Sequence, residues 1–210
     1  MNKKVNLISL DVHTCLIDGI DNELVAREIE EFSGQVPDIK DSHPAHTFYE
    51  DRYYPFEKPE CIKLLGKITE TVNSILGKEM IMDSVWTLTL ERGQSVVGHT
   101  HKVNNQLFPL DYYSISYYVN APSGSAELIF LTQYCNTIEN ATSIKPQTGM
   151  LTLFNSFVHH MTNRHYSDEK RIVISANFRP LKENLTISPD WSEYQVPTAD
   201  GLAYRQNALL

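Results

Sequence analysis

The chain has little positive charge. Its 18 lysines and arginines stand against 26 acidic residues, which gives the 210 residues a formal net charge of −8 at pH 7. A net negative field repels phosphate backbones, and the basic residues are scattered along the sequence and form no local patch. We therefore expect no binding of nucleic acid.

Cysteine and long apolar runs are also scarce. The three cysteines, Cys15, Cys61 and Cys135, have no metal-type spacing, so we interpret them as reduced thiols of a cytoplasmic protein. No stretch approaches the ~18 apolar residues that a membrane span needs. The first residues include a basic pair but lack the apolar segment of a signal peptide. The expectation is a protein without a membrane segment.

What is present begins with two predicted helices in the first third of the chain. One covers residues 22–33, with Asp21 as its N-cap and Gly34 as a stop signal. The other covers residues 59–77, where apolar residues recur at steps of three and four and form one buried stripe. The second helix should therefore pack one face against a core.

After residue 77 the apolar residues alternate with period two. We predict strands at 84–92, 113–120, 126–132, 149–154 and 171–178. Short, evenly spaced strands after a helical lead-in indicate a mostly β fold, a sandwich or barrel with flanking helices. We expect one domain over residues 1–180, with a helical lead-in (1–80) and a β core (81–180), followed by an extended tail (181–210).

Two of the eight histidines, His99 and His101, form an H-x-H pattern just after a predicted strand. Residues i and i+2 of an extended segment point to the same face, so two imidazoles in this pattern can grip one metal ion. The pattern alone leaves two interpretations open, a metal site and simple surface polarity.

Arg171 opens an otherwise apolar predicted strand. Its guanidinium either escapes to solvent at the strand end or enters the interior to meet an anion, because burying it without a partner is very costly. The inward interpretation predicts a carboxylate ligand. Spacing alone favours neither interpretation.

Three blocks of the sequence resemble the 2-oxoglutarate- and iron(II)-dependent oxygenases of the prolyl-hydroxylase-like superfamily, in particular a small group common in phage and bacterial genomes. The blocks are GHTH at residues 98–101, SISYYVN at 114–120, and GMLTLFNSFVHH at 149–160 followed by DEKRIVISAN at 168–177. They are similar to the family's H-x-D or H-x-H, its "S-x-x-Y-Y-L-N" strand, and its "G-x-L-x-L-F-P-S-x-x-x-H … R-x-S-I-x-x-N".

The resemblance implies a double-stranded β-helix of the jelly-roll, cupin-like kind, with Fe(II) and 2-oxoglutarate as cofactors and O₂ as a further cosubstrate. It implies that the metal ligands are His99, His101 and His160. It further implies that Arg171 and Tyr118 bind the far carboxylate of 2-oxoglutarate. Such an enzyme hydroxylates a C–H bond of a protein, peptide or small molecule and releases succinate and CO₂.

Strand parity adds two candidate pocket residues. Ser116 lies on the same face of its predicted strand as Ser114 and Tyr118. Asn177 shares the face of Arg171, where it either touches cofactor or substrate or is a hydrogen-bonded barrel residue.

The sequence departs from the family pattern at three positions. His101 occupies the place of the usual carboxylate ligand of the two-histidine, one-carboxylate triad. Lys102 replaces the proline that follows H-x-H, and Val173 replaces a serine that would donate a hydroxyl to 2-oxoglutarate. The nearest downstream acid, Asp111, lacks the H-x-D spacing. These changes keep two alternatives open, a zinc-dependent hydrolase on a three-histidine site and a non-catalytic binding or structural protein.

Other residues are assigned no part in the site. His159 should point away from His160, because adjacent strand residues face opposite sides. We expect the other histidines to be non-ligands, namely His13, His43, His46 and His165. Three large aromatic residues of the β core should be packing residues, namely Trp86, Phe130 and Phe154. The inter-helix loop with Tyr49, Tyr53 and Tyr54 should be either surface packing or a lid. Substrate identity and oligomeric state stay open.

Overall fold

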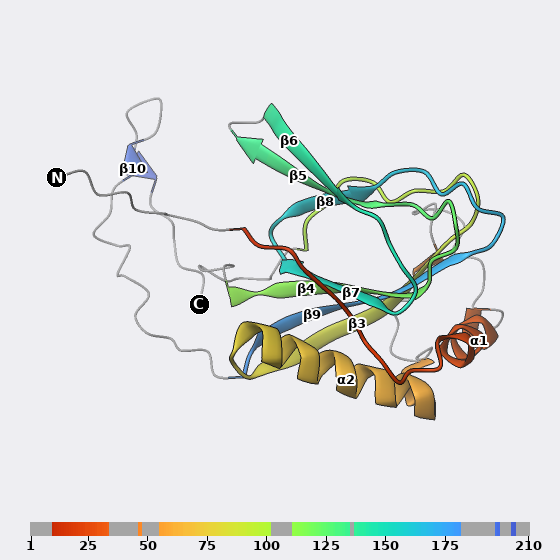
Figure 1. Ribbon diagram of the computed structural model, residues 1–210. Helices are drawn as coiled ribbons and strands as arrows, with labels where there is room; N and C mark the ends of the chain where they lie inside the picture. The colour runs from red at the N-terminus through yellow and green to blue at the C-terminus, as the bar shows by residue number, and fades with distance from the viewer. Residues whose placement is uncertain are drawn as a thin grey trace.

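The computed structural model describes residues 10–33, 46–47, 55–101, 111–134, 137–181, 196–197 and 203–204. Two antiparallel sheets lie one above the other, and helices cover the outer face of the larger one (Figure 1). The larger sheet has the strand order β1-β7-β4-β9-β3-β2, and the smaller has the order β6-β5-β8. The expected mostly β fold with flanking helices is confirmed, and the architecture is that of a double-stranded β-helix.

The described elements occur in the following order. They are β1 (His13–Leu16), α1 (Asn22–Ser33), β2 (His46–Thr47), the short 3₁₀ helix η1 (Pro55–Glu57), α2 (Pro59–Leu76), β3 (Met80–Leu90), β4 (Tyr113–Asn120), β5 (Leu128–Tyr134), β6 (Thr137–Ile144), β7 (Met150–Asn155), β8 (His159–Thr162), β9 (Arg171–Pro180), β10 (Val196–Pro197) and β11 (Ala203–Tyr204). The last two pair with each other within the region expected to be an extended tail.

The two helices follow the predicted bounds because their end signals work locally. Asp21 accepts a hydrogen bond from the backbone N–H of Leu24 at 2.9 Å, which caps α1. Pro59 starts α2, and Gly77 ends it in the left-handed conformation, with φ of 63°. Within the described residues, neither helix is both long and apolar enough to cross a membrane.

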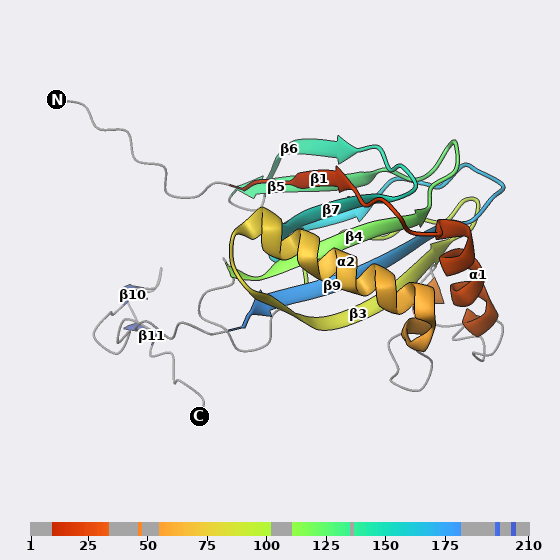
Figure 2. The ribbon, with the colours of Figure 1, turned by 60° about the horizontal axis from the view of Figure 1, so that its bottom comes forward.

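The main core lies between the helices and the outer face of the larger sheet. Helix α2 runs across that face (Figure 2) and buries the stripe Cys61, Leu64, Ile68 and Val72. A buried side chain of this size contributes about 1.5–3 kcal/mol relative to an exposed one, so the stripe holds the helix in place. The strands contribute the alternate residues of β4, β7 and β9 to the same core.

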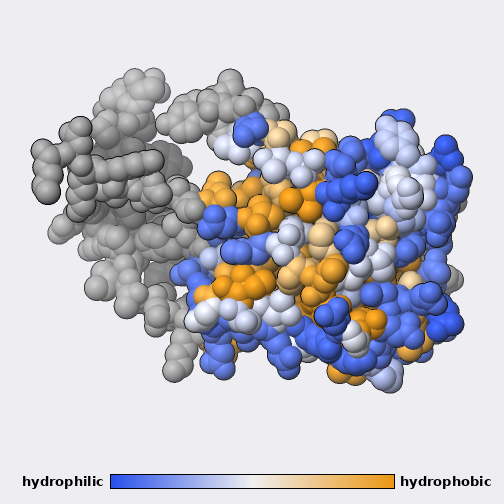
Figure 3. Space-filling view, viewed as in Figure 1, coloured by the Kyte–Doolittle hydropathy of each residue, from blue (hydrophilic) through white to orange (hydrophobic). Residues whose placement is uncertain are grey.

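Five strands were predicted at their observed positions to within a few residues, and β4 was predicted at its observed bounds. Strands β1, β6 and β8 and the two-residue strands β2, β10 and β11 were not predicted. In the view of Figure 3, the end of the molecule near α1 is mostly hydrophilic, and apolar side chains gather toward the other end of α2. The residues of the inter-helix loop from 48 to 54, including its three tyrosines, lie outside the described residues, as do His43 and Cys135.

Candidate metal centre

Three histidines that are distant in sequence converge between the two sheets. His99 and His101 come from the segment after β3, and His160 comes from β8. One ring nitrogen of each lies within 4.8 Å of the others. That span is close to what one metal ion with bonds of about 2.0–2.1 Å to nitrogen can bridge. The structure therefore brings together all three histidines that the resemblance implies as ligands.

Backbone hydrogen bonds fix the two ligand segments against each other. The N–H of His99 donates to the carbonyl of His160 at 3.0 Å, and the N–H of His160 donates to the carbonyl of His99 at 2.9 Å. The N–H of His101 donates to the carbonyl of Ser156 at 2.9 Å. The reciprocal pair makes residues 99 and 160 directly opposite antiparallel partners, so their side chains project to the same side.

Each imidazole has its Nδ1 beside an oxygen. The Nδ1 of His99 lies 2.9 Å from the carbonyl of Val97, and that of His160 lies 2.8 Å from the carbonyl of Val158. The Nδ1 of His101 lies 2.8 Å from Oδ1 of Asn177. A carbonyl oxygen can only accept, so each Nδ1 carries the proton and each Nε2 keeps its lone pair for a metal.

Burial keeps the two inner imidazoles neutral. Loss of solvation lowers the pKa of His101 to about 4, with the hydrogen bond to Asn177 acting in the opposite direction. Burial lowers the pKa of His160 to about 3, and the neighbouring histidines add to this effect. Neutral imidazole is the form that ligates metals, so both rings are in the binding form at neutral pH.

Aromatic rings surround the cluster. Phe154 stands edge-on to His160 at 4.8 Å between ring centroids and packs against Phe130 at 4.9 Å. Both phenylalanines are buried, as expected for packing residues. Trp86 also contacts the cluster, 5.2 Å from the His101 ring. The rings hold the imidazoles in place and limit the access of water to His160.

No carboxylate belongs to this cluster among the residues that the structure describes. Asp111, the nearest acid downstream of the H-x-H pattern, instead forms an ion pair with Lys78 at 2.7 Å. The candidate ligand set in the structure is therefore three imidazoles. Such a set carries no charge of its own, unlike a triad that contains a carboxylate.

A second buried polar group lies deeper on the inner face of the larger sheet. Arg171 is 1% exposed, and its Nε and Nη1 have no hydrogen-bond partner in the described part of the chain. Its guanidinium carbon lies 5.1 Å from the centre of the Tyr118 ring. The hydroxyls of Tyr118 and Thr152 are likewise buried without a partner. Of the two interpretations of Arg171, the structure favours the inward one.

The electrostatics of this group suits a bound anion. Burial lowers the pKa of Arg171, although a guanidinium remains protonated in proteins. Burial raises the pKa of the Tyr118 hydroxyl, with the positive charge of Arg171 opposing that effect. A buried cation with two guanidinium nitrogens that lack a partner in the described residues, beside two buried hydroxyls, forms a complementary environment for a carboxylate.

The register of the larger sheet connects the two groups. Ser114 lies opposite Asn177, Ser116 lies opposite both Ser175 and Thr152, and Tyr118 lies opposite Val173. Directly opposed residues share a face, so these side chains form an inner polar column that runs from His101 to Arg171. Ser114 and Tyr118 are four residues apart, about 13–14 Å along the strand.

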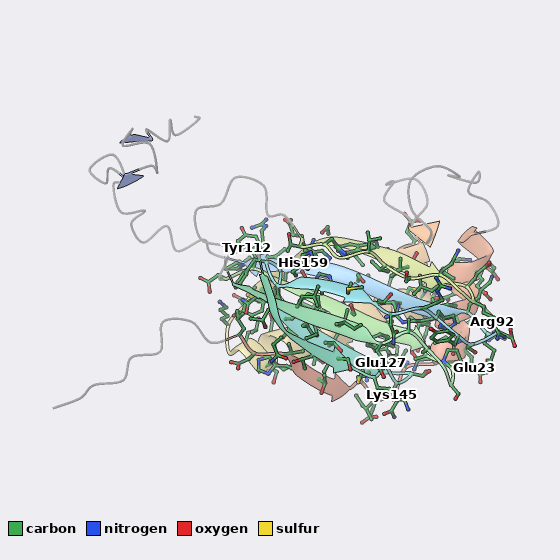
Figure 4. The ribbon with its side chains drawn as sticks, turned by 90° about the horizontal axis from the view of Figure 1, so that it is seen from above. Glu23, Arg92, Tyr112, Glu127, Lys145 and His159 are labelled. Carbon is green, nitrogen blue, oxygen red and sulfur yellow. The ribbon has the colours of Figure 1, made fainter. Side chains whose placement is uncertain are left out.

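Figure 4 shows the two ends of the barrel. His159, next to His160, lies at the end of the barrel that also holds Tyr112, and Arg92 lies at the opposite end. Arg171 pairs with Leu90, near that opposite end. The histidine cluster is thus toward one end of the barrel, and the cationic group lies deeper.

Three residues of this column were not singled out from the sequence. Ser114 contacts His101 at 2.7 Å, and Thr152 and Ser175 flank Ser116. Parity within 149–154 places Thr152 on one face with Phe154, but only the register shows that this face lies beside Ser116 and Tyr118. Thr152 supplies a hydroxyl where Val173, in the place of the family serine, cannot.

The other histidines take no part in the cluster. His159 points away from His160 and packs against Gly98, where a Cβ atom would come within 2.6 Å of its ring. His165 is fully buried, and its Nε2 donates to the carbonyl of Glu169 at 2.7 Å. His13 lies in β1, which pairs with β7 at the sheet edge. These placements agree with the expectation that they are not ligands.

Comparison with known proteins agrees with the motifs. Residues 84–177, which contain all five residues of the proposed site, match the family described as "Putative 2OG-Fe(II) oxygenase". No curated protein sequence matches the chain significantly.

Solved structures share its fold at low sequence identity. HygX from Streptomyces hygroscopicus, solved with nickel and 2-oxoglutarate, is 14% identical with a TM-score of 0.59, covering 91% of this chain and 90% of its own. A prolyl-4-hydroxylase from Pseudomonas putida is 13% identical with a TM-score of 0.56, covering 81% and 93%. The carbocyclase SnoK of nogalamycin biosynthesis is 13% identical with a TM-score of 0.62, covering 94% and 90%. The family match confirms the resemblance, and these solved structures show the same fold.

Proposed function

We propose that the chain is a 2-oxoglutarate- and iron(II)-dependent dioxygenase that hydroxylates a C–H bond of a protein, peptide or small-molecule substrate. The observation that carries the proposal is the buried, unpaired guanidinium of Arg171 on the same inner face as three converging imidazoles. A metal-binding cluster alone fits many functions. A metal-binding cluster with a desolvated cation nearby fits a cosubstrate that is both a chelator and a carboxylate.

The overall reaction is balanced: substrate R–H, 2-oxoglutarate and O₂ give R–OH, succinate and CO₂. Dioxygen gains four electrons, two from the oxidative decarboxylation of 2-oxoglutarate and two from the C–H bond. One oxygen atom enters the substrate and the other enters succinate. The iron supplies the activation of dioxygen, and the protein supplies ligands, orientation and a shielded site.

Each residue of the chain then has a defined task. His99, His101 and His160 hold the iron through Nε2, with their Nδ1 atoms already committed to oxygen acceptors. Arg171, Tyr118 and Thr152 bind the far carboxylate by charge and hydroxyl donation. Ser116 lies between the two groups, where the carbon chain of the diacid passes. Fixing both ends of the cosubstrate sets its position relative to the metal.

The surroundings support the exclusion of bulk water from this chemistry. Phe130 and Phe154 are 5% and 1% exposed and pack around His160. Trp86 is only half-buried and stands beside His101, so it lines the more open side of the cluster. We propose that the substrate approaches the metal past Trp86.

These features fit a protein in a reducing compartment of the cell. Cys15 and Cys61 are free thiols, which agrees with the cytoplasm of a bacterial or phage-infected cell. Ferrous iron is also maintained more readily under reducing conditions.

Anaerobic titration with Fe(II) and 2-oxoglutarate tests the proposal. A weak visible charge-transfer band should appear only when both are added. It should be lost in Arg171→Ala, which cannot hold the diacid, and in His160→Ala, which lacks a ligand. Arg92→Ala is the matched control, since Arg92 is an exposed arginine paired with Asp168.

Other results would support other functions. Tight zinc binding without 2-oxoglutarate binding would favour a hydrolase on three imidazoles, although Arg171 would then have no role. Binding of neither ligand would favour a non-catalytic protein with this fold. Succinate release measured against panels of peptides, amino acids and small metabolites, with His160→Ala as the blank, would then identify the substrate class.

A further inference from the structure

His101 differs from the other two metal-binding histidines in what holds its Nδ1. The Nδ1 atoms of His99 and His160 each face the carbonyl two residues earlier in the same segment, at Val97 and Val158. Such contacts come from the local backbone and need no particular side chain. The Nδ1 of His101 is instead held by side chains from other strands.

Two groups contact this nitrogen. Oδ1 of Asn177 lies 2.8 Å away, and Oγ of Ser114 lies 2.7 Å away. Asn177 comes from β9 and Ser114 from β4, and the two residues are direct partners in the sheet. Serine is ambiguous here because its hydroxyl can donate or accept. The asparagine oxygen can only accept, so it determines which nitrogen of His101 carries the proton.

The asparagine is itself held in orientation. Its Nδ2 donates to Oγ of Ser84 at 3.0 Å, which turns its Oδ1 toward His101. The hydroxyl of Ser114 donates to the same Oδ1 at 2.7 Å and also contacts Oγ of Ser156 at 2.8 Å. Two side chains, those of His101 and Ser114, thus contact the Oδ1 of Asn177, while Ser84 holds its Nδ2 and Ser156 contacts Ser114. This network is neutral, in agreement with a neutral imidazole.

We propose that Asn177 is the positioning residue that allows a histidine to act as a metal ligand at the position where the family usually has a carboxylate. Both oxygens of an ionised carboxylate carry lone pairs that can bind a metal, whereas imidazole binds metal only through an unprotonated nitrogen. Asn177 fixes the Nδ1–H tautomer of His101 and presents Nε2 to the metal. The inference rests on the proposed function for the identity of the metal, but it concerns metal binding and tautomer rather than turnover.

The test compares Asn177→Leu with Asn177→Asp. Leucine fills similar space without an acceptor, and aspartate keeps an acceptor at the same position. Cobalt(II) serves as the probe, with its affinity measured by visible absorption without 2-oxoglutarate. Loss of a hydrogen-bond partner of a ligand typically costs 10- to 100-fold in metal affinity. We expect this loss in Asn177→Leu and recovery to within a few-fold of wild type in Asn177→Asp.

A direct readout of the tautomer separates positioning from a general structural role. In the metal-free protein, long-range ¹H–¹⁵N NMR correlations of the histidine rings report which nitrogen is protonated. We expect His101 to be in the Nδ1–H form in the wild type and a tautomer mixture in Asn177→Leu. Asn120→Leu is the control, because the Asn120 side chain donates to the carbonyl of Lys170, away from the cluster. It should change neither tautomer nor cobalt affinity.

Unchanged cobalt affinity in Asn177→Leu, or an unchanged His101 tautomer, would overturn the inference. If Asn177→Leu fails to fold, Asn177→Ser with the same two measurements replaces it, since serine cannot reach His101 at the asparagine's distance. A wild type that binds cobalt but not 2-oxoglutarate would contradict the proposed function and leave the inference standing. A wild type that binds both, with an unaffected Asn177→Leu, would contradict the inference alone.

Discussion

Replacing the buried Arg171 should have opposite effects on the stability of the ligand-free protein and on the binding of 2-oxoglutarate. Arg171 is 1% exposed and has two guanidinium nitrogens without partners in the described part of the chain. In the ligand-free protein it is therefore a desolvated, poorly compensated charge. Replacing it by methionine keeps most of the side-chain volume and removes the charge.

The energetics of buried charges sets the expected size of both effects. Replacing buried ionic groups with apolar residues of similar volume is often neutral or stabilising by about 1–4 kcal/mol. We therefore expect the free energy of unfolding of ligand-free Arg171→Met to stay the same or to rise by that amount. Removing one partner of a buried charge pair costs about 2–5 kcal/mol in binding. The affinity for 2-oxoglutarate should fall by roughly 30-fold to several thousand-fold, at about 1.4 kcal/mol per tenfold.

Two assays measure these quantities separately. Urea unfolding of the ligand-free protein gives the free energy of unfolding, and anaerobic calorimetry with metal-loaded protein gives the affinity for 2-oxoglutarate. Arg92→Met is the control, because the side chains of Arg92 and its partner Asp168 are 61% and 84% exposed. Removing such an exposed pair costs about 0–1 kcal/mol and should not affect binding. A large loss of stability in Arg171→Met with intact 2-oxoglutarate binding would refute the assignment.

Other predictions test the site and the fold. Gly98→Ala should weaken cobalt(II) binding, since the new Cβ would lie 2.6 Å from the His159 ring next to two ligands; unchanged affinity would show that the segment yields easily. Gly66→Ala, in open space on α2, should stabilise the protein by about 1 kcal/mol through helix propensity and so raise the melting temperature. A lower melting temperature would contradict the placement of Gly66 in open space on the helix. Thr152→Val should weaken 2-oxoglutarate binding about 10- to 150-fold if its hydroxyl donates to the carboxylate, with cobalt affinity unchanged. Burial and Glu28 raise the pKa of Cys61, so its alkylation by iodoacetamide at pH 8, followed by mass spectrometry, should require unfolding.

Local sequence patterns were sufficient to predict much of the fold. The helix ends depend on Asp21, Pro59 and Gly77, which act through contacts within a few residues, and the structure has them where predicted. Parity within β4 correctly placed Ser116 and Tyr118 on one face. A two-residue repeat is a property of the strand itself, so the sequence carries it.

The strands that were missed lack such a pattern. β8 has four residues with two adjacent histidines, and β6 has the mostly polar sequence TIENATSI. β1 has four residues and is held by pairing with β7. Each depends on a neighbouring strand for its hydrogen bonds; for β1 and β8 that neighbour is distant in sequence, whereas β6 pairs with the preceding strand β5. Alternation in the segment itself therefore could not identify them.

The sequence by itself determined the chemistry available to this protein: three imidazoles, and an arginine and a tyrosine that lie in strands of defined parity. Tertiary structure decided how they are used. The pairing of His99 with His160 closes the ligand cluster, and the register that sets Ser114 against Asn177 places an acceptor behind His101. Register and sheet stacking arise from packing between segments some 60 residues or more apart, so no local repeat in the sequence encodes them.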